Sequence, residues 1–106
     1  MTPDDALFKA LADPTRRRLF ATLCREGELP VTELTKGARI SQPAVSKHLG
    51  VLRDAGLVAG RQDGRKTYYH ARPEQLEAVA EWTAEMRGFW AKRLDKFEDL
   101  LNRMDQ

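Results

Sequence analysis

Apolar residues in the first half of the chain recur at gaps of three and four, the spacing of one face of an α-helix. Residues that favour helix ends divide this region: Asp13, Thr32 and Ser41 suit N-caps, and Gly27 and Gly56 suit the positions after a C-terminus. The pattern predicts four short helices, at residues 4–11, 14–26, 32–38 and 42–55.

The pattern then changes to that of two β-strands. The segments LVAGRQ and RKTYYH flank an Asp-Gly dipeptide at 63–64, which favours a two-residue hairpin turn. This turn would place Val58 opposite Tyr69 at the root of the hairpin. It would also direct basic side chains at the tip into solvent, namely Arg61, Arg65 and Lys66.

One long helix is predicted from about Pro73 to Met104. An apolar stripe follows it at gaps of three and four: Val79, Trp82, Met86, Trp90, Leu94, Phe97, Leu101 and Met104. The helix would be about 48 Å long, more than a body built from the preceding residues can cover. We therefore expect a second copy of the chain to supply a partner helix. The alternative is a kink at Gly88 that folds the end back.

Length and composition suit one domain spanning residues 1–106, in which the segment of about 73–104 is the dimerisation helix. A hydrophobic fraction of 42% and a charged fraction of 32% fit a soluble protein. No apolar run approaches the roughly 20 residues of a membrane span, and we expect neither a membrane association nor a signal peptide. The single cysteine, Cys24, agrees with a cytoplasmic location, and we expect it to be a buried structural thiol.

The net charge of +2 conceals a basic middle third. Residues 36–72 contain eight Lys and Arg against two Asp, a net charge of +6, whereas residues 1–35 and 73–106 have net charges of −1 and −3. A local basic surface of this kind is typical of proteins that bind a polyanion. The alternative is an ordinary solvated face.

The helix at 42–55 divides into two faces at 100° per residue. Its inward face is apolar except for His48, which we interpret as a packed, hydrogen-bonded side chain rather than a metal ligand. The outward face is small and polar and contains Gln42, Pro43, Ser46, Lys47, Gly50, Arg53 and Asp54.

This outward face has the chemistry that recognition of a DNA major groove requires. Gln42 can pair with an adenine edge, and Ser46 can bond to bases or phosphate. Basic side chains of the helix and hairpin can reach guanine, phosphate or the adjacent minor groove. The predicted DNA contacts are Gln42, Pro43, Ser46, Lys47, Arg53, Arg61, Arg65 and Lys66.

Three stretches make the chain resemble the ArsR/SmtB winged-helix repressors: LADPTRRRLFATL, SQPAVSKHLGVLRDAGLV and RQDGRKTYYH. The resemblance implies a mainly α-helical winged helix-turn-helix fold with a small β-hairpin wing. It implies a homodimer through the first and last helices, and repression from an inverted-repeat promoter operator in double-stranded DNA until a ligand weakens the complex. The dimerisation residues would be Leu7, Leu11, Trp82, Met86, Trp90, Leu94, Phe97 and Leu101.

Two departures from the family concern metal and backbone. Metal sensors of the family have ELCVCDL where this chain has ELPVTEL, and neither Pro30 nor Thr32 is a soft-metal ligand. No histidine follows His70, so the zinc pattern of the last helix is absent as well. We therefore expect no metal, no cofactor and a metal-independent repressor. Related sequences often have glycine where this chain has Arg39, which predicts a strained backbone conformation or a solvent-facing role near DNA.

Several alternatives stay open. An organic inducer could bind between subunits at Trp82, Phe89 and Trp90, or these side chains could simply pack. The arginines at 16–18 could contact phosphate or pair with nearby acidic residues. The chain could also be a protein-interaction module without DNA activity, or sense a metal or small molecule through an unrecognised site. No nucleophile–base pair, metal cluster or glycine-rich phosphate loop indicates an enzyme.

Overall fold

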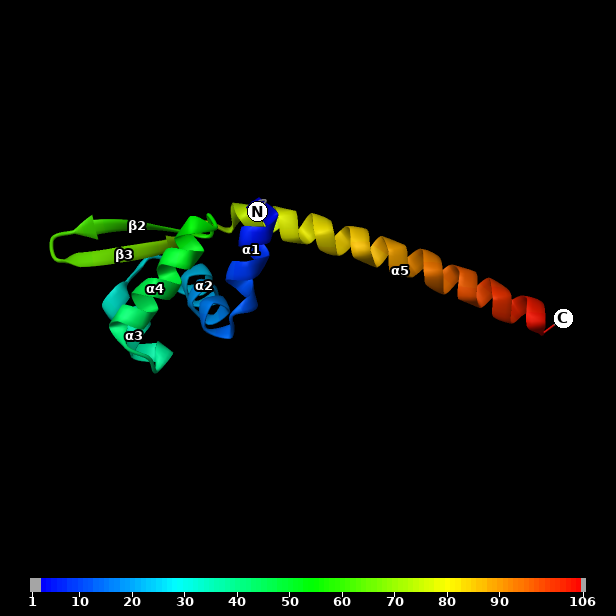
Figure 1. Cartoon of the computed structure of the whole chain (residues 1–106), viewed down its shortest axis with the longest axis horizontal. Helices are drawn as coiled ribbons and strands as arrows, with labels where there is room; N and C mark the ends of the chain where they lie inside the picture. The colour runs from blue at the N-terminus through cyan, green and yellow to red at the C-terminus, as the bar shows by residue number, and fades with distance from the viewer. Residues whose placement is uncertain (1–2, 106) are drawn as a thin grey trace. The chain divides into compact units, whose positions relative to one another are not determined.

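The computed structural model describes the backbone of residues 3–105 and the side chains of residues 5–105. One compact unit ends at Leu76 and another begins at Glu77. The elements follow the predicted order, with one additional short strand (Figure 1). They are α1 (Pro3–Ala12), α2 (Pro14–Glu26), β1 (Leu29–Pro30), α3 (Val31–Ala38), α4 (Gln42–Asp54), β2 (Val58–Asp63), β3 (Lys66–Ala71), the 3₁₀ turn η1 (Pro73–Gln75) and α5 (Leu76–Met104).

The N-caps of α2 and α4 are confirmed. The side chain of Asp13 accepts a hydrogen bond from the backbone N–H of Arg16 at 3.0 Å, and that of Ser41 accepts one from Ala44 at 3.3 Å. Each satisfies a donor that the first turn of a helix leaves without an intrahelical partner. The hydrogen bond from Arg16 also lowers the pKa of the Asp13 carboxyl.

The predicted cap of α3 is wrong. This helix begins at Val31, and its N-cap is Pro30, whose side chain makes no capping hydrogen bond. Pro30 is extended because it pairs with β3 as the last residue of β1. Thr32 therefore lies inside the first turn, with its side chain exposed.

Arg16 and Arg17 cap the C-terminus of α1. The guanidinium of Arg16 donates to the carbonyls of Ala10 and Lys9 at 2.7 and 3.1 Å. That of Arg17 donates to the next two carbonyls at 2.6 and 3.1 Å. The last carbonyls of a helix lack intrahelical partners and attract cations, so two of the three consecutive arginines serve to join α1 to α2.

The hydrophobic core forms within the unit that ends at Leu76. Helix α4 supplies Val45, Leu49 and Leu52, each with an exposed fraction of 0%. Burial of one such side chain contributes roughly 1.5–3 kcal/mol. The predicted orientation of α4 is confirmed, because its polar face is exposed. The other buried residues are Leu7, Ala10, Leu19, Phe20, Leu23, Val31, Leu34, Leu57, Val58 and Tyr69.

Cys24 is exposed, so the prediction of a buried thiol is wrong. The buried side chains of α2 are Leu19, Phe20 and Leu23. At 100° per residue, Cys24 lies about 90° from the middle of the arc that these three define. Cys24 therefore lies beyond the edge of the buried face of α2, where its side chain stays exposed.

The hairpin turn lies one residue later than predicted. Asp63 and Lys66 are the last paired residues of β2 and β3, so Gly64 and Arg65 form the turn. Of these two, only Gly64 has a positive φ, 63°. A glycine at the first turn position and one positive φ are the features of a type II′ hairpin turn.

The shifted turn changes the pairing at the root of the hairpin. Val58 pairs with Ala71 and Gly60 pairs with Tyr69, so the predicted Val58–Tyr69 pair is wrong. A Cβ atom at Gly60 would lie 3.0 Å from the ring of Tyr69. Because Gly60 has no side chain, this register leaves room for Tyr69, which is only 7% exposed.

The two-residue strand β1 was not predicted. Leu29 pairs with Tyr69 and Pro30 with Tyr68, which gives an antiparallel sheet in the order β1-β3-β2. A strand of two residues has no measurable alternation, and its proline is tolerated because β1 lies at an edge.

Helix α5 runs without interruption through Gly88, so the alternative of a kink that folds the end back is wrong. Most of its large apolar side chains, including Trp82 and Trp90, are exposed within the described chain. No helix among the described residues is long and apolar enough to cross a membrane.

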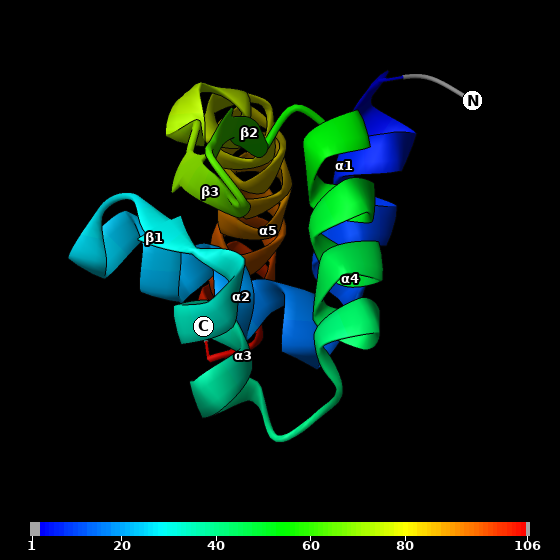
Figure 2. The same ribbon diagram turned by 90° about the vertical axis from the view of Figure 1, so that its left-hand side faces the viewer.

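In Figure 2 a short connection links α3 to α4. Within this connection, Arg39 adopts a left-handed conformation, with φ 59° and ψ 25°. It is the one residue other than glycine with a positive φ in the described part of the chain. This confirms the first of the two roles expected for Arg39, because the conformation crowds the Cβ of any L-residue.

We predict that Arg39→Gly raises the free energy of unfolding by up to about 1 kcal/mol, because glycine adopts this conformation without strain. Arg39→Val should lower it by about 1 kcal/mol, since β-branched residues are least suited to positive φ. Urea denaturation of both variants measures the difference. Equal destabilisation by both would show that side-chain contacts, rather than backbone strain, determine this position.

Candidate functional site

The outer face of α4 is the first component of the candidate site. The N-terminus of α4 resembles that of α2, because a capping residue is followed by a proline in the first turn: Ser41 is the cap and Pro43 the proline. Gln42, Ser46 and Lys47 are exposed, because the core side chains of the helix lie on its opposite side. All of the side chains of α4 predicted to contact DNA, Gln42, Pro43, Ser46, Lys47 and Arg53, lie at the surface.

A hollow of about 180 Å³ lies between the start of α4 and the hairpin. Gln42 and Ser46 line it from the helix, and Arg65 and Lys66 line it from the hairpin tip. The fold thus brings two residues of α4 together with two hairpin residues that lie about 20 positions later in the sequence. Polar side chains from the helix and cations from the hairpin face the same space.

Arg53 and Arg61 line a neighbouring hollow of about 210 Å³. Thr67 and Tyr69 line both hollows, so strand β3 separates them. Arg53 lies 3.4 Å from the carboxylate of its neighbour Asp54, in an exposed ion pair. The structure therefore divides the predicted basic residues into two groups.

Arg61 differs from the other basic residues because it is bound to Glu28. Its Nη2 lies 2.6 Å from Oε1 of Glu28, and its Nε lies 3.0 Å from Oε2. The guanidinium also lies 4.8 Å from the ring centroid of Tyr68 and 3.7 Å from Asp63. Arg61 thus connects the hairpin to the residue that precedes β1.

The ion pair changes the pKa of both partners. Hydrogen bonds from Arg61 lower the pKa of the Glu28 carboxyl, and the positive charge of His70, when protonated, acts in the same direction. Hydrogen bonds to Glu28 raise the pKa of Arg61. The contact is therefore present at neutral pH and is lost as pH falls through the lowered pKa of Glu28.

Thr32 and Thr67 were not predicted as site residues, yet both line the hollow beside Gln42 and Ser46. As a helix cap, Thr32 would have used its hydroxyl within the chain, whereas its side chain is exposed. Thr67 and Tyr69 are two residues apart on β3, so their side chains lie on the same face of the strand. The sequence alone could have placed Thr67 beside Tyr69 in this way. Hydroxyl groups at such positions can donate to phosphate oxygens.

His48 belongs to the scaffold of the site. Its ring is half-buried, and its Nδ1 lies 3.3 Å from Nη1 of Arg16, the residue that also caps α1. Arginine can only donate, so Nδ1 accepts this hydrogen bond in the neutral imidazole. Among the described residues, no group of three or more His, Cys, Asp or Glu is arranged to hold a metal ion.

The apolar face of α5 is a second candidate surface. Trp90 is 65% exposed and Leu94 57% exposed, far more than residues of a core. Trp82, Phe97 and Leu101 of the same predicted stripe are exposed too, and Met86 is half-buried. Exposed apolar surface of this extent marks an interaction site.

The two leucines of α1 that were predicted to contact a second copy differ. Leu7 is only 2% exposed and packs in the core of its own unit, whereas Leu11 is half-buried. Leu7 therefore packs α1 against the core, and of the two leucines only Leu11 has a side chain that is partly accessible.

Comparisons with known proteins identify relatives over most of the chain. Residues 11–61 match the family described as a helix-turn-helix domain. The arsenic resistance transcriptional regulator ArsR1 of Pseudomonas putida is 45% identical over 80 residues, which cover 76% of this chain and 59% of the relative. The HTH-type transcriptional regulator Rv2034 of Mycobacterium tuberculosis is 38% identical over 101 residues, which cover 95% of this chain and 90% of the relative.

A solved ArsR family transcriptional regulator has the same fold, with a TM-score of 0.78 and 35% identity. The match covers 84% of this chain and 91% of that one. This chain thus spans nearly the whole of two relatives, but 59% of the length of ArsR1.

We predict that Arg61→Gln raises the pKa of Glu28 toward its ordinary value, because the largest cause of the lowered pKa is removed. Carboxyl carbon chemical shifts followed by NMR during a pH titration measure it. Arg65→Gln is the matched control, since Arg65 lies at the hairpin tip outside this ion pair. An unchanged Glu28 titration in Arg61→Gln would show that the ion pair does not persist in solution.

Proposed function

Because the chain belongs to the ArsR family of helix-turn-helix transcriptional regulators, we propose that it is a dimeric repressor that binds an inverted-repeat operator in double-stranded promoter DNA. The observation that carries this proposal is the hollow that joins the polar face of α4 to the basic hairpin tip. The resulting surface combines groups that read bases with groups that bind phosphate.

In this proposal α4 enters the major groove. Gln42 and Ser46 contact base edges from the start of the helix, while Lys47 neutralises phosphate. The hollow beside them receives the sugar–phosphate backbone, with Arg65 and Lys66 on one side. The hydroxyls of Thr32 and Thr67 supply additional donors to the same phosphates.

Arg61 has a smaller role in DNA binding than Arg65 and Lys66. Its guanidinium would have to leave Glu28 before it could bind phosphate. The bidentate pair of hydrogen bonds between the two side chains opposes that exchange. Neither Arg65 nor Lys66 forms an ion pair among the residues that the structure describes. They can therefore bind phosphate without losing an intrachain partner.

The dimer brings two such surfaces to one operator. We assign the exposed stripe of α5 to contacts with the second copy, and likewise Leu11 of α1. Two-fold symmetry then requires an inverted repeat with half-sites about one helical turn, roughly 34–36 Å, apart. The protein acts in the cytoplasm, where its DNA target lies.

The repressor is metal-independent in this proposal. Pro30 and Thr32 occupy the positions where related metal sensors have cysteines, and neither side chain offers a soft ligand. Control then comes from the level of the repressor or from an organic effector.

We predict that the double variant Gln42→Ala, Ser46→Ala weakens specific DNA binding by at least about tenfold, since one good base contact is worth roughly 1–3 kcal/mol. Selection from genomic fragments supplies the operator, and fluorescence anisotropy at several salt concentrations measures binding. Thr22→Ala, on α2, is the control. Undiminished operator binding by the double variant would overturn the contact assignment, and no specific DNA at modest salt would favour the protein-interaction module instead.

We predict that Trp90→Glu or Leu94→Glu weakens the dimer by at least about 100-fold, because each copy loses a buried apolar side chain worth roughly 1.5–3 kcal/mol and gains a buried charge. Sedimentation equilibrium of the full chain measures the change. Asn102→Glu adds the same carboxylate about 140° away from the stripe at 100° per residue and should leave the dimer intact. Dimers that persist in both stripe variants would exclude this interface.

A further inference from the structure

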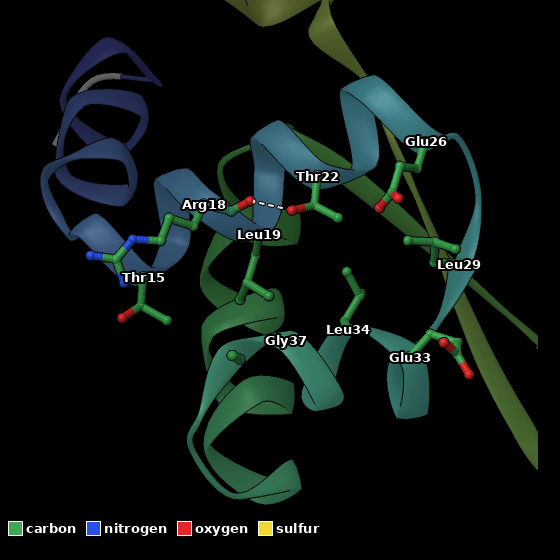
Figure 3. A pocket seen from close by; sticks show the side chains of 10 residues that line it. Thr15, Arg18, Leu19, Thr22, Glu26, Leu29, Glu33, Leu34 and Gly37 are labelled. Carbon is green, nitrogen blue, oxygen red and sulfur yellow. Dashed lines mark hydrogen bonds between the residues drawn. The ribbon is translucent and has the colours of Figure 1, made fainter.

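A pocket of about 410 Å³ lies between α2 and α3, outside the DNA-binding surface described above (Figure 3). Leu19 lines it from α2, Leu34 from α3 and Leu29 from the segment between them. Leu19 and Leu34 are themselves part of the core, with exposed fractions of 4%. The floor of the pocket is therefore apolar and is held by the packing of the fold.

Opposite charges stand at the two ends of this apolar floor. Arg18 extends toward Thr15 at one end, and Glu26 and Glu33 lie at the other end, on either side of Leu29 (Figure 3). Glu33 pairs with Lys36 at 2.9 Å. Within the part of the chain that the structure describes, the side chains of Arg18 and Glu26 form no hydrogen bond or ion pair, so both are available to a ligand.

The two charges are well separated. Arg18 and Glu26 are eight residues apart on α2, which corresponds to about 12 Å along the helix. A free amino acid, in which ammonium and carboxylate adjoin one carbon atom, is too short to reach both. The Arg18 side chain extends beyond its backbone position toward Thr15, so the separation suits a linear molecule with its two charges about 10 Å apart and a hydrogen bond of about 3 Å at each end.

Gly37 keeps the pocket open. It lies within α3 without a positive φ, and a Cβ atom built on it would meet nothing within 4 Å. Neither backbone conformation nor close packing requires a glycine here, and glycine is unfavourable within a helix. A larger side chain at this position would occupy space in the pocket that Gly37 lines.

We propose that this pocket binds a linear zwitterion of tripeptide length, with its cationic end at Glu26 and its anionic end at Arg18. An extended tripeptide spans about 10 Å, and its central apolar side chain would lie on Leu19 and Leu34. The site is separate from the surface assigned to DNA, and its occupancy does not depend on the proposed function.

The experiment uses the tripeptide Ala-Leu-Ala as the probe and isothermal titration calorimetry on the full chain. N-acetylation removes its cation and C-terminal amidation removes its anion. Each modification should weaken binding to the unmodified chain by about tenfold or more, because each removes a charge-assisted hydrogen bond.

Variants of the chain assign each end of the peptide. Arg18→Gln should bind the free acid and the amide equally, and Glu26→Gln should bind the free amine and the acetylated form equally. Gly37→Leu should abolish binding while circular dichroism shows the helices retained. Arg25→Gln, another arginine of α2 that does not line this pocket, should bind like the unmodified chain.

Three results would overturn the proposal. They are no heat of binding at millimolar peptide, equal binding of the peptide and its two blocked forms to the unmodified chain, and undiminished binding to Gly37→Leu. The Arg18 and Glu26 variants change solvent-facing side chains, so they keep the test decisive even if Gly37→Leu fails to fold. DNA binding is measured separately, so failure of the proposed repressor function would be recognised independently.

Discussion

Burial of the apolar side of α4 is the constraint on which the surface of this protein depends. Val45, Leu49 and Leu52 are inaccessible to solvent, and rotating the helix would expose them at a cost of several kcal/mol. Because the inward side cannot move, Gln42 and Ser46 on the outward side have a fixed direction. A helix that reads DNA needs this fixed direction more than it needs any single contact, since base recognition depends on geometry.

The neighbouring elements hold α4 through polar contacts as well. Arg16 caps α1 and reaches His48 on α4, so one guanidinium connects three helices. On the hairpin side, Glu28 binds Arg61 across the sheet. Arginine suits both positions because its planar donors can serve several acceptors at once. Basic residues that the sequence groups together thus divide between holding the scaffold and presenting charge to a polyanion.

Much of this arrangement was predictable from the sequence, because strong local signals agreed with the tertiary packing. The caps at Asp13 and Ser41, the two faces of α4 and the continuous stripe of α5 all follow from periodicity and side-chain chemistry. Agreement between local and global preferences of this kind is what allows a short chain to specify one fold.

The failures share a different cause, which is that the deciding partner lies far away in the sequence. The hairpin register depends on fitting the ring of Tyr69 over Gly60, and strand β1 exists only because β3 pairs with it. The position of the Arg61 side chain is determined by its hydrogen bonds to Glu28, which lies 33 residues earlier in the sequence. The prediction for Cys24 was wrong for a related reason. How much of the surface of a helix is buried depends on the neighbouring elements rather than on the helix itself.

Helix α3 relates the pocket to the DNA-binding surface. Its first turn carries Thr32 beside the hairpin, and its later residues Leu34 and Gly37 line the pocket against α2. It then passes into α4 through the left-handed Arg39. A ligand in the pocket could regulate DNA binding only if it binds one arrangement of α3 and α4 better than another. Since Val31 and Leu34 anchor α3 in a close-packed core, such arrangements would differ by a shift of the whole helix rather than by local bending.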